Sequence, residues 1–269
     1  MARLRALLID LSGTVHVGDA ATADAAQALD KLRNAGIALR FVSNTSKESR
    51  ASLLSKLKKM RLDVREEELF TSLSAAAEVV RNRGLKPLYL LSPSAREDFP
   101  PDTTGTPDSV VVGLAPAAFD YKQLNEAFRL LAGEEGGGQR GQVPLIVTHK
   151  ARYFGDKDGR LSLGPGPFIS ALEEASGVKA EIVGKPEPAF FQLALDSLES
   201  LSLSPPEIGM IGDDVQQDVG PAVAALGLRR FLVQTGKYRS GDEAKCEAGR
   251  PDWCGADFAS AVESILQHA

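Results

Sequence analysis

The chain is poor in cysteine and lacks long hydrophobic runs, and each scarcity excludes a class of protein. Two cysteines in 269 residues, Cys246 and Cys254, are too few for a disulfide framework. Their spacing is also not the C-x-x-C of a zinc site. No apolar run approaches the roughly 20 residues of a membrane-spanning helix. Arg3 and Arg5 lead straight into a strand pattern instead of a signal peptide. We therefore expect a cytoplasmic protein with no membrane partner.

An excess of charge of one sign is also missing. The formal net charge is −5, and the basic residues are spread along the chain apart from a short cluster at 56–61. That cluster falls in a helical pattern and is typical of a solvated helix face. The charge therefore indicates no nucleic-acid partner. At 269 residues, 43% of them hydrophobic, the chain is long enough for one large domain or two of ordinary size.

Short apolar runs alternate with helical patterns through most of the chain. Strands separated by helices in this way predict an α/β fold with a parallel sheet. In the first and last parts of the chain, we expect strands at 5–10, 37–44, 207–214 and 229–236. The helices expected between them lie at 22–35, 47–61 and 219–227.

The middle of the chain has the same alternation and one interruption. Its expected elements are strands at 87–92, 109–114 and 144–149 and a helix at 121–132. Residues 151–164 instead predict a β-hairpin that turns at Asp158-Gly159, a pair that favours such turns. This interruption indicates a domain inserted into another, with a core of 1–75 and 181–269 and an insert of 76–180. Residues 133–142 are rich in glycine and predict a surface loop.

Polar residues stand where several of the expected strands end. Ligands of an open parallel sheet bind outside the carboxyl ends of its strands. Each group alone is typical of a capped turn, but together they suit one site. Lys185 precedes Pro186, which we expect to begin a helix whose positive end lies near the lysine. In chain order the groups are Asp10, Ser43-Asn44, Lys185 and Asp213-Asp214.

Transfer of a phosphoryl group would use all of these residues. It needs a nucleophile, positive charge and hydrogen-bond donors around the phosphate oxygens. Asp10 and Asp213 supply the hard carboxylate oxygens that Mg²⁺ prefers, and Asp10 could also attack phosphorus. Ser43, the Asn44 amide and Lys185 could hold the phosphate oxygens.

Four segments resemble the motifs of the haloacid dehalogenase (HAD) phosphatase superfamily: "DLSGT", "VSNTS", "VGKPEPAFF" and "MIGDD". The segments "GLAPAAFDYKQLNEAFRLL" and "THKARYFGDKDGRLSLGPGPF" resemble the large α/β (C2-type) cap of one of its subfamilies. The resemblance implies a Rossmann-like core with an inserted cap, a Mg²⁺ cofactor and a small phosphorylated substrate. It leaves open whether the chain is a monomer or a homodimer formed through the cap.

The same resemblance implies a role for individual positions. Asp10 would be the nucleophile and a metal ligand, with Asp213 and the Ser12 carbonyl completing the metal site. Asp214 and Asp218 would lie around that site, outside the ligand set. The residues that would contact the substrate are Asp10, Leu11, Ser12, Ser43, Asn44 and Lys185.

Ser12 departs from the pattern of the superfamily. Most of its phosphatases have a second aspartate at this position, which protonates the leaving group and later activates water. A serine hydroxyl titrates too high for that task, and such acid–base help is typically worth about 10² to 10⁴ in rate. We therefore expect substrates with good leaving groups: pyrophosphate, acyl phosphates, aryl phosphates and protonated phosphoramidates. His16 could act in its place. The alternative is a binding or regulatory protein of the same fold with little turnover.

Other readings of the motifs have less support. No G-x-G-x-x-G follows the first strand, which argues against a dinucleotide-dependent oxidoreductase. No G-x-S-x-G surrounds Ser12, which argues against a serine hydrolase. On the expected hairpin, Lys150, Arg152 and Tyr153 could face either a substrate or the solvent. His149 has no partner pattern.

Overall fold

The computed structural model describes residues 3–101, 104–135, 141–155 and 160–267. The chain forms two compact units. The first comprises Met1–Ser43, Leu54–Phe70 and Lys185–Ala269, and the second comprises Asn44–Leu53 and Thr71–Gly184. The chain thus leaves the first unit and returns to it, as in an inserted-domain architecture. The domain limits near residues 75 and 180 stay a prediction.

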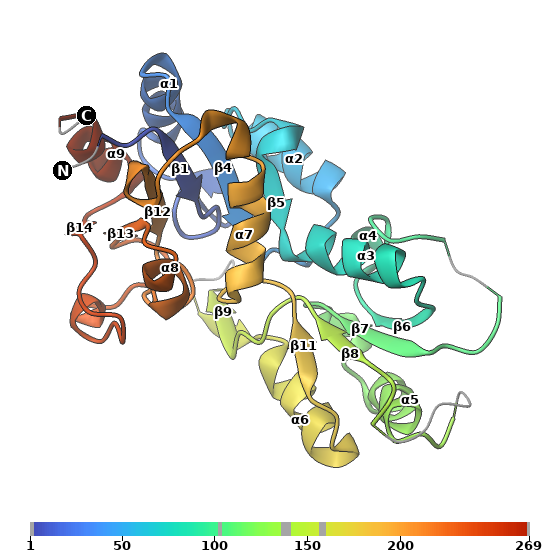
Figure 1. The fold of residues 1–269 in the computed structure, drawn as a ribbon. Coiled ribbons are helices and arrows are strands. Elements are labelled where there is room, and N and C mark those ends of the chain that lie inside the picture. The colour runs from blue at the N-terminus through green and yellow to red at the C-terminus, as the bar shows by residue number, and fades with distance from the viewer. Residues whose placement is uncertain (1–2, 102–103, 136–140, 156–159, 268–269) are drawn as a thin grey trace. The chain divides into compact units, whose positions relative to one another are not determined.

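The first unit is built on a six-stranded sheet (Figure 1). Its strand order is β14-β13-β12-β1-β4-β5, and the strands from β14 to β4 pair in parallel. The strands are β1 (Ala6–Ile9), β4 (Ala38–Ser43), β5 (Leu69–Thr71), β12 (Ile208–Gly212), β13 (Arg229–Val233) and β14 (Trp253–Gly255). The predicted parallel α/β fold is confirmed.

The central strands owe their position to their sequences. β1 reads ALLI and β12 reads IGMIG, and both are buried throughout. Continuous apolar runs of this kind are typical of strands covered on both faces by helices. The helices of this part of the chain are α1 (Ala25–Asn34), α2 (Arg50–Lys59), α7 (Pro188–Asp196), α8 (Pro221–Ala225) and α9 (Phe258–Gln267). Among them, α1 packs on α9 and α7 packs on β4.

The helices predicted for this part of the chain begin later than expected; α2, expected from 47, begins at Arg50, and α8, expected from 219, begins at Pro221. The expected helix at 22–35 begins at Ala25, because Ala20–Ala21 (β3) pairs with His16–Val17 (β2) in a short hairpin. The helix expected at Pro186 begins instead at Pro188. The reason is local: a residue that precedes proline is disfavoured in helical conformation, so Glu187 stays extended and the helix begins at Pro188.

The second unit has a four-stranded parallel sheet of its own, in the order β11-β8-β7-β6. Its strands are β6 (Pro87–Leu90), β7 (Ser109–Val112), β8 (Leu145–Val147) and β11 (Ala180–Ile182). Its helices are α3 (Ser72–Arg83), α4 (Pro93–Arg96), α5 (Tyr121–Leu131) and α6 (Gly166–Ser176). The strand and helix expectations for this region are therefore confirmed, with shorter strands.

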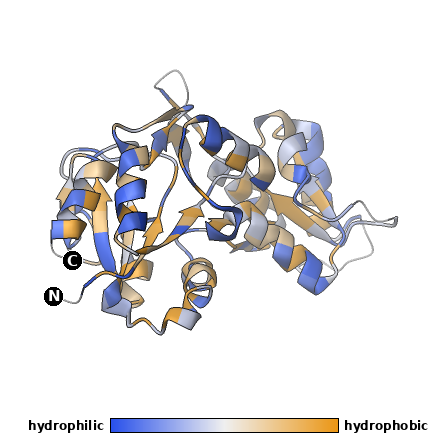
Figure 2. Cartoon of the chain, turned by 90° about the horizontal axis from the view of Figure 1, so that it is seen from above, coloured by the Kyte–Doolittle hydropathy of each residue, from blue (hydrophilic) through white to orange (hydrophobic). Residues whose placement is uncertain are grey.

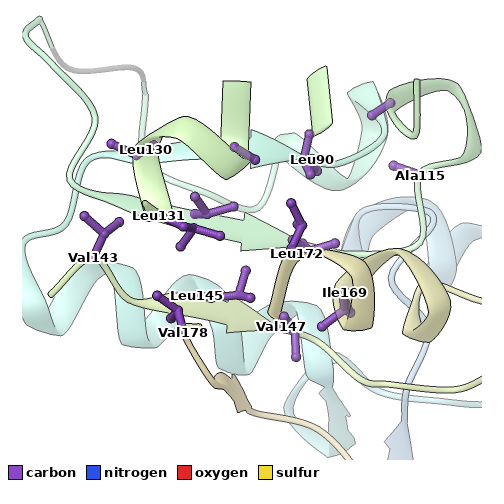
Figure 3. Close-up of a cluster of buried hydrophobic side chains, with 14 residues drawn as sticks. Leu90, Ala115, Leu130, Leu131, Val143, Leu145, Val147, Ile169, Leu172 and Val178 are labelled. Atoms are coloured by element: carbon purple, nitrogen blue, oxygen red, sulfur yellow. The ribbon is translucent and has the colours of Figure 1, made fainter. Parts of the chain in front are cut away.

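Alternate residues of these strands feed two apolar clusters. Val110, Val112, Leu145 and Val147 pack with residues of α5 and α6, and Figure 3 shows this cluster. Val111 and Ile146 point the other way and pack with residues of α3 and α4. The alternation follows from the two-residue period of a strand. Hydrophobic residues accordingly gather in the strands in Figure 2, whereas the helices carry both kinds.

The predicted hairpin is present as β9 (Tyr153–Gly155) and β10 (Leu161–Leu163), which pair antiparallel with Phe154 opposite Ser162. The turn expected at Asp158-Gly159 lies outside the described residues, as do residues 136–140 of the glycine-rich loop. None of the helices in the described part of the chain has the length and apolarity to cross a bilayer.

Candidate active site

A buried ion cluster lies at the carboxyl ends of β1 and β12. The Lys185 ammonium donates to Asp10 Oδ1 at 2.5 Å and to Asp218 Oδ1 at 2.6 Å. All three side chains are almost wholly removed from solvent, with Lys185 only 2% exposed. Removing a charged group from water costs free energy, so buried charges are normally paired. Buried pairs of ionisable groups cluster at functional sites.

Strand pairing explains why these residues meet. Ile9 lies beside Ile211 in the register, and the Asp10 N–H donates to the Ile211 carbonyl at 2.9 Å. Asp213 therefore leaves β12 beside the point where Asp10 leaves β1. Asp218 lies on the loop that follows β12, and Lys185 is the first residue of the chain's return to this unit.

Three carboxylates of this cluster could hold a cation. Asp10, Asp213 and Asp218 each offer an oxygen, and these oxygens lie within 4.8 Å of one another. Within the described residues, Asp213 Oδ1 accepts no hydrogen bond, whereas Oδ2 accepts one from the Lys237 N–H at 2.6 Å. A set of carboxylate oxygens with one of them free of hydrogen bonds is hard-ligand chemistry and fits Mg²⁺.

Burial and like charge shape the electrostatics of the cluster. Burial, joined by repulsion from Asp10, raises the pKa of Asp213 well above its ordinary value. Burial likewise raises the pKa of Asp218 to about 6, although the Lys185 ammonium opposes the shift. Burial alone would lower the pKa of Lys185, but the carboxylates of Asp10 and Asp218 raise it. The lysine therefore stays a cation, and the raised pKa values of Asp213 and Asp218 reflect burial and like-charge repulsion that a metal ion would relieve.

The turn that follows β1 contains other residues that were predicted to belong to the site. The Leu11 carbonyl accepts hydrogen bonds from the N–H groups of Val15 and His16, which closes the turn. Ser12 is exposed at its outer side. The Thr14 hydroxyl donates to Asp10 Oδ2 at 3.2 Å. His16 is buried in β2, with its Nδ1 3.1 Å from the Gly18 carbonyl, and its proposed role in place of the missing aspartate stays a prediction.

Ser43 and Asn44 follow the neighbouring strand. Ser43 is the buried last residue of β4, which pairs with β1 so that Phe41 lies beside Ile9. Asn44 is the first residue of the second unit. The pairing supports Ser43 as a neighbour of the site, while the role of Asn44 stays a prediction.

Asp214 takes a different position from Asp213. Its Oδ1 accepts from the backbone N–H groups of Gln216 and Gln217, and its Oδ2 accepts from the Lys237 ammonium at 3.1 Å. Burial alone would raise the pKa of Asp214, but the Lys237 charge and these N–H groups lower it. Asp214 thus holds a loop together, whereas Asp218, expected outside the ligand set, lies in the three-carboxylate cluster.

Sequence reasoning gave no role to Thr14, Thr235 or Lys237. The Thr235 hydroxyl donates to the Gly13 carbonyl, and Lys237 contacts both Asp213 and Asp214. A signal was available for the last two, because they follow the end of β13 just as the recognised residues follow β1 and β12. The short segment "TGK" contains no carboxylate and matches no motif of the site, so its sequence alone does not indicate a role.

Three residues of the second unit, Lys150, Arg152 and Tyr153, were predicted to face either a substrate or the solvent. Lys150 pairs with Glu173 at 2.6 Å, while Arg152 and Tyr153 are exposed on the hairpin segment. His149 is buried, with Nδ1 accepting from the Ala151 N–H. Lys150 and His149 therefore have structural partners, and substrate contact by Arg152 or Tyr153 stays a prediction.

Comparison with known proteins agrees with this geometry. Residues 7–99 match the model of the family "Haloacid dehalogenase-like hydrolase", and residues 182–261 match a HAD-hydrolase-like model. Haloacid dehalogenase-like hydrolase domain-containing protein 2 of Bos taurus is 48% identical over 265 residues, which cover 98% of this chain and 97% of that one. Phospholysine phosphohistidine inorganic pyrophosphate phosphatase of Homo sapiens is 36% identical, over 100% and 97% of the two chains.

The fold is shared with solved structures as well. The crystal structure of 4-nitrophenylphosphatase from Thermotoga maritima superposes with a TM-score of 0.82 at 23% identity, and covers 97% of each chain. The predictions of the fold and of a phosphatase of this superfamily are confirmed at the level of the family. The chain belongs to the haloacid dehalogenase-like hydrolases.

Proposed function

We propose that this hydrolase is a Mg²⁺-dependent phosphatase that works through a phosphorylated Asp10 and acts on small compounds with good leaving groups. The observation that carries the proposal is the buried contact of Lys185 with Asp10, beside the oxygens of Asp213 and Asp218. This arrangement provides a carboxylate nucleophile, a fixed cation and a place for a metal within one unit.

The residues of the chain have distinct tasks in this reaction. An Asp10 oxygen forms a bond to phosphorus while the bond from phosphorus to the leaving group breaks. Lys185 holds Asp10 and offers positive charge to the phosphate oxygens. Water then attacks phosphorus, which releases phosphate and restores the Asp10 carboxylate. Asp10, Asp213 and the Ser12 carbonyl would hold Mg²⁺, with Asp218 next to them, and the ion would neutralise charge on the transferred group.

Ser12 determines which leaving groups are suitable. Its side chain is exposed at the turn, where a hydroxyl can donate a hydrogen bond but cannot shuttle a proton near neutral pH. Bonds that break without a proton from the enzyme are therefore preferred. The name of the 36% identical relative agrees, because phospholysine and phosphohistidine contain P–N bonds and pyrophosphate a P–O–P bond. The nitrophenyl phosphate in the name of the structural neighbour is an aryl ester with a good leaving group.

The alternative of a binding protein with little turnover is not favoured, because both relatives with a named activity are phosphatases. We infer a cytoplasmic location and a small-molecule partner from the composition, in which both cysteines are free.

Phosphate release tests the proposal directly. The substrates are pyrophosphate, a phosphoramidate, p-nitrophenyl phosphate and a sugar phosphate, each with Mg²⁺ and with EDTA. We expect Mg²⁺-dependent release from the first three, abolished in Asp10→Asn. Equal release in EDTA, or full activity of Asp10→Asn, would contradict the proposal.

A further inference from the structure

Residues 235–237 form a loop, named the TGK loop, that contacts two strand-end turns of the site. The Thr235 hydroxyl donates to the carbonyl of Gly13, in the turn after β1. The Lys237 N–H donates to Asp213 Oδ2, after β12, at 2.6 Å. The loop follows β13, which neighbours β12 in the sheet, and so meets both turns at the same edge. The loop contacts Asp213, an expected metal ligand, and the turn that follows Asp10, another expected ligand.

The space around Asp213 is closed by two glycines. A Cβ atom on Gly236 would lie 2.1 Å from Asp213 Oδ2 and 2.5 Å from Gly13 Cα. A Cβ atom on Gly13 would also lie 2.1 Å from the same oxygen. Both residues have positive φ, +54° and +100°, which glycine adopts without strain. The approach of the two loops therefore depends on glycine at both positions.

One consequence is that the two oxygens of Asp213 are not equivalent. Oδ2 is enclosed by the glycines and accepts the Lys237 N–H, whereas Oδ1 accepts no hydrogen bond from the described part of the chain. Because Oδ2 already accepts a hydrogen bond and lies nearer to both glycines, a cation binds more readily through Oδ1. Mg²⁺ requires octahedral geometry and suits single carboxylate oxygens, whereas Ca²⁺ takes more ligands and accepts bidentate carboxylates.

The side chain of Lys237 separates the roles of two adjacent aspartates. Its ammonium lies 3.1 Å from Asp214 Oδ2, while backbone N–H groups occupy Asp214 Oδ1. Both oxygens of Asp214 are thus occupied. The TGK loop therefore leaves one oxygen of Asp213 available for a ligand, whereas both oxygens of Asp214 bind groups of the protein.

We propose that the TGK loop is a positioning element that makes Asp213 a one-oxygen ligand and thereby favours Mg²⁺ over Ca²⁺. The inference rests on the proposed function, since it assumes that Asp213 binds a divalent cation. Its basis is the geometry of Gly13, Gly236 and the Lys237 backbone around one carboxylate.

Calorimetric titration of the metal-free protein with MgCl₂ and with CaCl₂, without substrate, tests this role. In Gly236→Ala the new methyl group displaces the loop from Asp213. We expect Mg²⁺ affinity to fall by about 10- to 100-fold, the usual effect of losing a partner of a metal ligand. Ca²⁺ affinity should fall less, because Oδ2 becomes available, so the Mg²⁺/Ca²⁺ ratio should drop.

Gly241→Ala is the matched control. Gly241 also has positive φ, +88°, but a Cβ atom there would have no neighbour within 4 Å. It introduces the same kind of backbone strain without touching Asp213, so metal affinity should stay within about twofold of the wild type. A thermal melt of both variants verifies that each is folded before titration.

Lys237→Met separates the backbone from the ammonium. It keeps the N–H that binds Asp213 and removes a positive charge, so Mg²⁺ affinity should stay equal or rise. A fall equal to that of Gly236→Ala would overturn the inference, as would equal losses for Mg²⁺ and Ca²⁺ in Gly236→Ala. Wild-type protein that binds no Mg²⁺ would overturn the proposed function as well, whereas normal binding by both wild type and Gly236→Ala would overturn the loop's role alone.

Discussion

The two units of the molecule have the same construction and bury different side chains. Each has parallel strands flanked by helices. Near the strand ends of the first unit, charged side chains are buried beside uncharged ones such as Ser43; the charged ones are Asp10, Lys185, Asp213 and Asp218. Among the described residues of the second unit, the buried polar side chains are hydroxyls and one histidine, His149. A parallel sheet thus offers a place for a site, but buried paired charges identify the sheet that has one.

The largest expected effect comes from removing the cation of the buried cluster. Lys185→Met leaves Asp10 and Asp218 without their common partner and removes charge from the phosphate site. We expect phosphate release from pyrophosphate to fall by about 10² to 10³-fold. The matched change in the second unit is Arg83→Met, which breaks an exposed pair with Glu181. Similar losses in both variants would remove the distinction between the units.

Apolar packing, by contrast, should dominate the stability of the second unit. Leu145 is 1% exposed and belongs to the cluster in Figure 3. Leu145→Ala should lower the free energy of unfolding by about 2 to 5 kcal/mol, measured by urea denaturation. Arg83→Met should change it by less than about 1 kcal/mol, because the broken pair is exposed. A larger cost for the charge change would contradict the comparison.

Glu68, a buried carboxylate of the first unit outside the ion cluster, should behave as a structural group. Burial alone would raise the pKa of Glu68, but hydrogen bonds from Arg33 at 2.8 Å and 2.7 Å lower it. Because the pKa is lower in the folded state, the pair stabilises the protein above the ordinary pKa of glutamate. That contribution disappears as the pH falls through the folded-state pKa.

Glu68→Gln should therefore lower the free energy of unfolding at pH 7 by about 1.5 to 3 kcal/mol. The difference from wild type should shrink as the pH is lowered below 4.5 in urea titrations. Glu181→Gln, whose partner is exposed Arg83, should show little difference at any pH. A difference for Glu68→Gln that is constant with pH would show that its charge is not responsible.

The sequence allowed most of the fold to be predicted, because long runs with a clear period mark their elements. The central strands β1, β4 and β12 and the helix α5 lie where the pattern placed them. Strands β5 and β14 were not predicted, because LFT and WCG lack the surrounding apolar run that marks β8, a strand of the same length. They form because neighbouring strands offer a ladder. Helix α7 begins at Pro188 and not at Pro186, because Glu187, which lies between the two prolines, is extended.

The site was predictable to the extent that its residues have reactive side chains. Asp10, Lys185 and Asp213 were recognised by their chemistry at strand ends. The TGK loop acts through a backbone N–H and through the absence of a side chain at Gly236, and neither appears as a motif. The membership of Asp218 in the carboxylate cluster also depends on how its loop folds back, which no local pattern shows.

The central claim is that Ser12 restricts this phosphatase to leaving groups that depart without a proton. The most direct measurement is kcat/KM for a sugar phosphate and for a phosphoramidate, in wild type and in Ser12→Asp, with saturating Mg²⁺. We predict that the wild type strongly prefers the phosphoramidate and that Ser12→Asp raises the sugar-phosphate value by about 10²-fold or more. A wild type that hydrolyses both equally, or a substitution that leaves the ratio unchanged, would contradict the claim.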